Sequence, residues 1–130
     1  SGLIDFGVHG KNHEPVSSLL ENDFRAGLIE SINKIENCCG KTVDSYAFPF
    51  GQKSHRGAFD LKFFNSIGLS YVCTTDWGIN KLSDNPKFLK RIRIDSEDTL
   101  QDFKEKIKGS WDFVSFFQYI KNIKWNLKKY

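Results

Sequence analysis

The chain has 130 residues, of which 39% are hydrophobic and 27% are charged, and its formal net charge at pH 7 is +3. These values are typical of one globular domain over residues 1–130 and exclude a chain too polar to bury a core. No apolar run approaches the roughly 20 residues of a membrane-spanning helix. Residues 81–130 carry 12 Lys or Arg against 7 Asp or Glu, which usually indicates a solvated face and only weakly an anionic surface such as lipid headgroups.

A strand, a turn-rich loop and a helix are expected in the first 40 residues. Residues 3–8 are a short apolar run typical of a buried strand, and residues 9–15 are rich in turn formers. Ser18 and Glu21 have the spacing of a capping box, which predicts the start of a helix, and Gly40 is its expected left-handed C-cap. Apolar residues recur in this helix at helical spacing: Leu20, Phe24, Leu28, Ile32 and Ile35.

Three further strands and two helices are expected between the first helix and residue 108. The strands are predicted at residues 43–50, 69–75 and 91–95, and the helices at about 58–67 and at 99–108. Strands that alternate with helices imply crossover connections. The order therefore predicts an α/β fold with about four mainly parallel strands and flanking helices.

The last segment, residues 110–130, is expected to form an amphipathic basic helix. Its apolar stripe has helical spacing: Phe113, Phe116, Phe117, Ile120, Ile123 and Leu127. We expect this stripe to pack against the core, with membrane association as the less favoured alternative. Aromatic residues do not interleave with the basic ones as stacking platforms would, so nucleic acid is not expected as a partner.

Two of the three histidines, His9 and His13, lie four residues apart directly after the first predicted strand. In parallel sheets the chemistry gathers at the carboxyl ends of the strands. Two imidazole nitrogens suit zinc, nickel or cobalt, and a usable site needs a third ligand, normally a carboxylate. The pair is therefore a candidate metal site, although the spacing by itself favours two polar surface histidines.

Four segments share, in order, the motifs of a known enzyme family. Residues 5–13 read DFGVHGKNH and residues 45–51 read SYAFPFG. Residues 61–75 end in YVCTT, and residues 85–92 read NPKFLKRI. Over residues 3–95 the chain resembles the C-terminal portion of the polysaccharide deacetylases with NodB homology, carbohydrate esterase family four.

The resemblance implies a metal-dependent hydrolase that removes N-acetyl groups from a polymer of N-acetylated amino sugars. It also implies that residues 1–130 form part of a distorted (β/α) barrel. His9 and His13 would be the metal ligands, with zinc as the expected metal and nickel or cobalt as alternatives. The implied partner is a glycan.

The same resemblance implies a sugar groove beside the metal. Phe48, Pro49 and Phe50 would form one wall of it, and the backbone N–H of Phe50 would help to hold the oxyanion that develops at the acetamide carbonyl. Trp77 would line the groove as well, or would equally be an ordinary aromatic residue packed at a strand end.

Several positions depart from the family pattern. Gly10 stands where a Ser or Thr is usual, Ala47 where an Arg is common, and Phe50 where a Tyr is usual; no histidine follows His55, where a late Leu-x-His motif would supply the general acid. The first signature, TFDDG, which carries the catalytic base and a ligating aspartate, has no counterpart. Both groups are therefore expected upstream of this chain, in a missing half of the barrel or on a partner chain.

Two functions stay open at this point: an active deacetylase completed by those residues, and a catalytically inactive, deacetylase-like domain that binds a glycan. The location is also open. The family suggests a secreted or cell-envelope protein. Three cysteines expected to be free thiols (Cys38, Cys39 and Cys73) and a start without a signal-peptide pattern are compatible with the cytoplasm.

Overall fold

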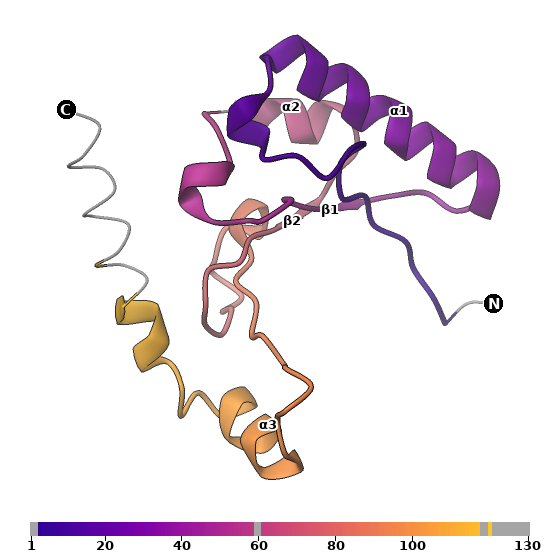
Figure 1. Ribbon diagram of the computed structural model, residues 1–130. Coiled ribbons are helices and arrows are strands. Elements are labelled where there is room, and N and C mark those ends of the chain that lie inside the picture. Colours follow the sequence, from indigo (N-terminus) through magenta and orange to yellow (C-terminus); the bar gives the residue numbers. More distant parts are fainter. Residues whose placement is uncertain (1–2, 59–60, 118–119, 121–130) are drawn as a thin grey trace.

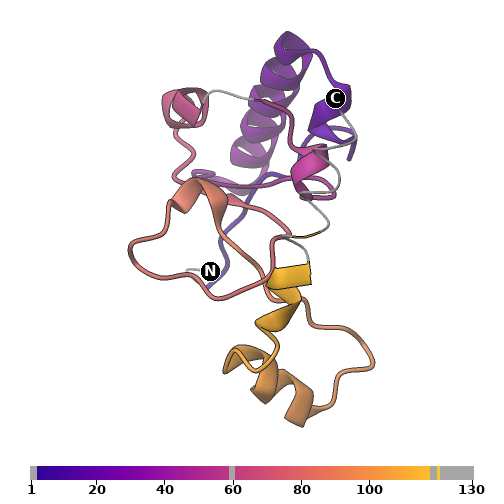
Figure 2. The ribbon, with the colours of Figure 1, turned by 90° about the vertical axis from the view of Figure 1, so that its left-hand side faces the viewer.

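The computed structural model of the protein describes residues 3–58, 61–117 and 120. It is a small α/β structure, mostly helical, so the expected α/β class is confirmed, but its parallel sheet has two strands where about four were expected. Helices α1 (Glu21–Cys39) and α2 (Leu61–Ser66) lie on one side of the sheet, whereas α3 (Leu100–Ile107) lies apart from them (Figure 1). The view from the side shows the same separation (Figure 2).

The sheet consists of β1 (Ser45–Ala47) and β2 (Tyr71–Cys73), which pair in parallel from their first residues onward. Two single bridges extend it: Val8 pairs in parallel with β1, and Leu89 pairs in parallel with β2. Four stretches of chain therefore lie side by side. Because all of them run parallel, their carboxyl ends lie at the same edge of the sheet. Short 3-10 turns lie between the longer elements: η1 (Val16–Ser18), η2 (Lys53–His55) and η3 (Pro86–Phe88).

The first and fourth predicted strands are wrong as strands. Only Val8 of residues 3–8 joins the sheet. Leu3 is 94% exposed, and no strand among the described residues pairs with the segment on its outer side. Residues 91–95 are not a strand either: the Asn80 side chain makes two hydrogen bonds of 2.9 Å with the backbone of Lys90 just before them, and the Arg91 N–H donates to the Asp76 carbonyl at 2.9 Å. A strand without a continuous partner cannot form a ladder, so these segments stay irregular.

Helix α1 confirms the first predicted helix but not its predicted cap. The N-cap residue is Leu20, whose side chain makes no capping hydrogen bond, and the Ser18 hydroxyl donates instead to the carbonyl of Pro15 at 2.7 Å. The C-cap is as predicted: Gly40 has φ 64°, and its N–H donates to the carbonyl of Glu36 at 2.8 Å. Only glycine adopts this left-handed conformation without strain, which is why the helix ends there.

The hydrophobic core lies between α1, α2 and the sheet. Phe24 of α1 contacts the rings of Tyr46 and Phe64, and the last two are stacked with centroids 5.7 Å apart. Such ring pairs stabilise a core by roughly 0.5–1.5 kcal/mol each beyond their buried area. The predicted second helix is confirmed as α2, and residues 59 and 60 of its predicted range lie outside the described residues.

Helix α3 confirms the predicted helix over residues 99–108 and is capped by a complete capping box between Thr99 and Asp102. Its Lys106 is 4% exposed. The Lys106 ammonium donates to the Asp98 carboxylate at 2.5 Å and lies 5.9 Å from the ring centroid of Trp77. This lysine therefore ties α3 to the chain that follows β2.

The C-terminal helix is observed in part, since residues 113–117 are helical and residues 118–119 and 121–130 lie outside the described residues. The expected core packing is wrong for its first turns: Phe113, Phe116 and Phe117 are 58%, 61% and 63% exposed. Among the described residues, no helix is long and apolar enough to cross a membrane.

Candidate functional site

The first predicted ligand, His9, is held at the carboxyl edge of the sheet. Val8 donates its N–H to Ser45 at 2.9 Å and accepts from Ala47 at 3.0 Å, so the next residue emerges beside the end of β1. Nδ1 of His9 lies 2.8 Å from the carbonyl oxygen of Ala47. Because a carbonyl oxygen can only accept, Nδ1 carries the proton, and Nε2 is left with a free lone pair. This is the arrangement usual for a metal-ligating histidine.

The second predicted ligand, His13, is brought next to the first. The two imidazole centroids are 4.9 Å apart, and the His13 ring lies another 4.9 Å from the Phe50 ring. The loop that joins the histidines is tight, with φ 83° at Gly10 and φ 55° at His13. A Cβ on Gly10 would lie 3.3 Å from Cγ of Pro49. The positive φ and the nearby Pro49 ring therefore explain why a glycine occupies position 10.

The loop after β1 turns sharply at the predicted oxyanion residue. Phe50 and Gly51 both have positive φ, 59° and 58°, and the Phe50 carbonyl accepts from the Gln52 N–H at 2.8 Å and from the Thr75 hydroxyl at 3.1 Å. The backbone N–H of Phe50 donates to no group in the part of the chain that the structure describes. Phe50 is 49% exposed, so this N–H can donate a hydrogen bond to an oxygen atom of a ligand.

The predicted groove residues separate into two groups. Phe48 is 3% exposed and its ring contacts Tyr46 at 4.9 Å between centroids, so it belongs to the core and does not face a groove. Pro49 is also buried, and its ring lies close to Gly10. Phe50 and Trp77, by contrast, line one cavity of about 640 Å³ together with Gln52, Thr75, Val114 and residues 91–94.

A partly buried ion pair that the sequence did not reveal fixes the two walls of this groove. The Arg56 guanidinium donates through Nε to the Gly51 carbonyl at 2.8 Å and pairs through its terminal nitrogen with the Asp76 carboxylate. Arg56 thereby holds the chain after Phe50 against the chain before Trp77. Its role depends on residues far apart in sequence, so no local pattern could have indicated it.

His55 lies half-buried against the Phe50 ring, with the two ring centroids 5.6 Å apart. Its Nδ1 is buried and has no hydrogen-bond partner among the described residues. The third histidine thus belongs to the same neighbourhood as the other two, since both its ring and that of His13 lie against Phe50.

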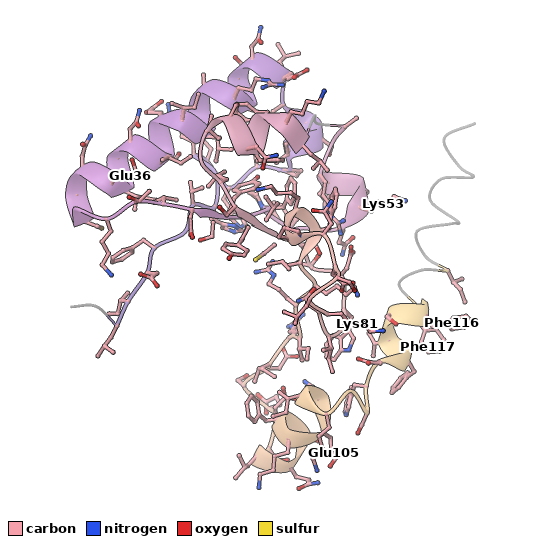
Figure 3. The ribbon with its side chains drawn as sticks, turned by 180° about the vertical axis from the view of Figure 1, so that it is seen from behind. Glu36, Lys53, Lys81, Glu105, Phe116 and Phe117 are labelled. Carbon is pink, nitrogen blue, oxygen red and sulfur yellow. The ribbon has the colours of Figure 1, made fainter. Side chains whose placement is uncertain are left out.

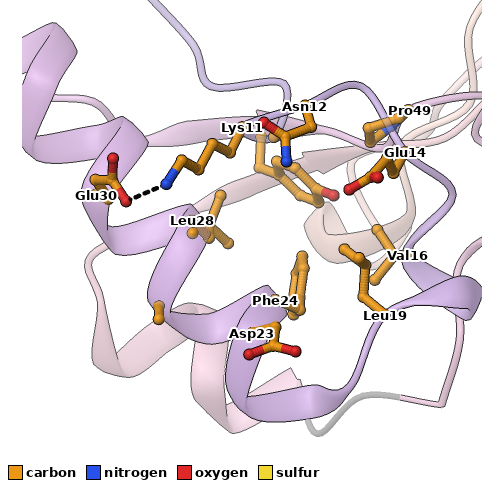
Figure 4. A pocket seen from close by; sticks show the side chains of 14 residues that line it. Lys11, Asn12, Glu14, Val16, Leu19, Asp23, Phe24, Leu28, Glu30 and Pro49 are labelled. Carbon is orange, nitrogen blue, oxygen red and sulfur yellow. Dashed lines mark hydrogen bonds and ion pairs between the residues drawn. The ribbon is translucent and has the colours of Figure 1, made fainter.

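A second pocket of about 300 Å³ lies between the histidine loop and α1 (Figure 4). Lys11 reaches across it and pairs with Glu30 at 2.7 Å, while Glu14 and Asp23 also border it. Tyr46 lines its floor, and burial raises the pKa of this phenol well above its ordinary value, so the hydroxyl stays protonated.

The donor set at His9 and His13 suits a divalent metal as far as it goes. Two neutral imidazoles, one oriented through its Nδ1–H, can supply two ligands to zinc, nickel or cobalt. Within the described ranges, no cluster of three His, Cys, Asp or Glu residues is positioned to hold a metal ion. A third ligand would therefore have to come from elsewhere.

No family model matches the chain, and no curated protein matches it. What can be said about its function therefore depends on its own residues and their geometry.

Proposed function

We propose that this chain is the part of a metal-dependent polysaccharide deacetylase that carries two histidine ligands and one side of the sugar groove. The observation that carries the proposal is the meeting of His9, His13 and Phe50 at one edge of the sheet, with the Nδ1 of His9 engaged by Ala47. The ordered resemblance over residues 3–95 supports the same family. In this reading the sheet and its helices are part of the family's distorted (β/α) barrel.

His9 and His13 would hold the metal, zinc first and nickel or cobalt as alternatives. When bound, the metal would polarise the acetamide carbonyl and lower the pKa of a bound water. The chain's own residues do the rest of the positioning. The Ala47 carbonyl holds the proton of the neutral His9 imidazole on Nδ1, which leaves Nε2 as the ligating atom, and the tight loop at Gly10 keeps His13 beside it.

The Phe50 backbone N–H would donate to the oxyanion as water adds to the acetamide carbonyl. Preorganised donors of this kind contribute about 10²–10³ to the rate of acyl transfer. The Phe50 and Trp77 side chains would contact the apolar faces of the sugar rings across the groove that they share. The base and the third ligand would be supplied from outside this chain, by further barrel segments or a partner chain.

A second candidate is a deacetylase-derived domain that binds a glycan without cleaving it. Gly10, Ala47 and the lack of a histidine after His55 favour it. Under this alternative the groove with Phe50 and Trp77 keeps its role, and the histidine pair does not.

Metal binding is the first test. Zinc titration of the purified protein by calorimetry should show one site. His9→Ala and His13→Ala should each lower the zinc affinity by more than about 100-fold. Substitution of a residue that only supports a metal ligand typically costs about 10- to 100-fold, and loss of the ligand itself should cost more. His55→Ala is the matched control, since its ring lies behind Phe50, and should leave the zinc affinity unchanged. Equal affinities in all four proteins would refute the histidine site.

Acetate release from N-acetylglucosamine oligomers is the second test, made with the zinc-loaded protein at its natural length. Release that is lost in His9→Ala and His13→Ala supports the hydrolase. Oligomer binding without release, unchanged in both variants, selects the glycan-binding alternative.

A further inference from the structure

The groove that Phe50 and Trp77 line is positively charged. Arg91 and Arg93 both border it, whereas no aspartate or glutamate of the described chain does. The pocket between the histidine loop and α1 has the opposite sign, with three carboxylates against one lysine. The positive charge is therefore a property of the groove and not of every hollow in the molecule. Charge complementarity favours an anionic group as part of its occupant.

Arg91 is the cation that the fold fixes at this groove. Its backbone N–H donates to the Asp76 carbonyl at 2.9 Å, and its Nε donates to the Thr74 carbonyl at 2.5 Å. Within the described chain its guanidinium makes no other hydrogen bond and pairs with no carboxylate, and the carboxylate of Asp76 is already paired with Arg56. The two terminal nitrogens of Arg91 are therefore available to a ligand, in the fork geometry that matches a carboxylate.

Arg93 is a second cation, held more loosely. Its Nε pairs with the Asp95 carboxylate at 2.5 Å, but the two side chains are 79% and 40% exposed. Exposed ion pairs contribute little, because water and salt screen them. Arg93 can therefore exchange Asp95 for an anionic ligand at small cost.

The neutral part of the lining suits a sugar chain better than a bare anion. Phe50 and Trp77 offer rings to the apolar faces of sugar units. The Phe50 N–H and the Gln52 side-chain amide make no hydrogen bond within the described residues, so both can bond to hydroxyl or acetamide groups. The volume of about 640 Å³ lies in the range of ordinary ligand sites.

We propose that this groove takes an acidic glycan, in which the carboxylate of a uronate unit pairs with Arg91 and a neighbouring N-acetylated unit lies against Phe50 and Trp77. The place given to the N-acetylated unit rests on the proposed function. The pairing with Arg91 rests on the charge of the groove and requires no metal, so the two can fail separately.

The test is calorimetry with two tetrasaccharides in buffer that contains a chelator. Hyaluronan alternates N-acetylglucosamine with glucuronate, whereas chitotetraose contains N-acetylglucosamine alone. Hyaluronan should bind about tenfold tighter or more, as one charge-assisted pair allows, and added salt should reduce this difference. Arg91→Gln should abolish most of the difference, and Arg91→Lys should restore only part of it, since an ammonium lacks the fork. Arg93→Gln should lower the affinity for hyaluronan about threefold.

Lys34→Gln is the matched control, because it removes one positive charge from α1 and should leave the hyaluronan affinity unchanged. Glu36, on the same part of α1, lies across the molecule from Phe116 and Phe117, which follow the groove residue Val114 (Figure 3). Circular dichroism establishes that each variant is folded. The comparison of the two tetrasaccharides on the wild type decides the question even if Arg91→Gln does not fold.

Equal affinities of the wild type for the two tetrasaccharides, or no binding of hyaluronan, would overturn the inference. Neither result would touch the metal site, which depends on His9 and His13. Tighter binding of an oligothymidylate than of hyaluronan would also overturn it and would assign the groove to single-stranded nucleic acid. A preference for hyaluronan that depends on Arg91, in a protein that binds no zinc, would support the acidic groove and count against the deacetylase.

Discussion

Gly51 and Gly40 provide a matched pair for testing how the loop at the candidate site is built. Both have a left-handed backbone, with φ 58° and φ 64°, so alanine would be strained to a similar degree at either position. They differ in the space around them. A Cβ on Gly51 would lie 2.7 Å from Cγ2 and 2.8 Å from the backbone nitrogen of Thr75, whereas a Cβ on Gly40 would meet nothing within 4 Å.

The expected costs follow from these two geometries. Left-handed alanine costs about 1–2 kcal/mol, and the stiffer unfolded chain offsets about 0.4–1 kcal/mol of it, so Gly40→Ala should destabilise by about 1 kcal/mol. Gly51→Ala adds an overlap with backbone that cannot rotate away, and overpacking typically costs 1–3 kcal/mol more. We therefore expect Gly51→Ala to lower the free energy of unfolding by about 3 kcal/mol, or about 2 kcal/mol beyond the effect of Gly40→Ala.

Urea unfolding followed by tryptophan fluorescence measures both variants under one set of conditions, with Gly68→Ala as a second open control. Gly68 has φ 80° and also has nothing within 4 Å of an added Cβ. If the three alanine variants are equally stable, the close approach of Thr75 to Gly51 does not limit this loop. The reasoning about how Phe50 is positioned would then fail with it.

Two other features of the described chain can be tested in the same way. Arg56→Ala should lower the free energy of unfolding by about 2 kcal/mol, because it leaves the Gly51 carbonyl and the Asp76 carboxylate without their buried donor; Arg56→Lys should recover less than half, since an ammonium cannot reach both in the fork geometry. Equal stability of the alanine variant and the wild type would contradict this. The hydrogen bond from Lys106, followed by the one from the Asp95 N–H, lowers the pKa of Asp98 below its ordinary value of 3.8. The stability that these interactions give the folded state should be fully present above that value and should be lost as the pH falls through the lower pKa of the folded state. Asp98→Asn should reduce this loss of stability at low pH, measured by urea unfolding from pH 6 downward.

Much of the local structure could be read from short-range patterns. The spacing of Phe24, Leu28 and Ile32 predicts α1 because one turn of helix places such residues on one face, and all three are buried. Gly40 predicts the end of α1 because a left-handed C-cap depends on one residue alone. The pair Thr99 and Asp102 likewise sits in a capping box inside the range predicted for α3.

Features that depend on distant partners were not readable in this way. Residues 3–8 and 91–95 have the composition of strands, but a strand exists only where a neighbour supplies its hydrogen bonds, and the loop at Asn80 takes those of Lys90. The cap at Ser18 was misplaced for a similar reason, since its hydroxyl bonds to Pro15 and the helix begins after Leu20.

The candidate site divides along the same line. The sequence alone places His9 and His13 in a turn-rich loop and Phe50 on the loop after a strand, because turn residues and strand ends are local signals. Only the tertiary structure decided that these three rings meet, that Phe48 goes into the core, and that Arg56 joins the walls of the groove. The spacing of Phe113, Phe116 and Phe117 likewise predicts an apolar stripe, but whether a stripe is buried depends on what the rest of the fold places against it, and here the described fold places nothing there.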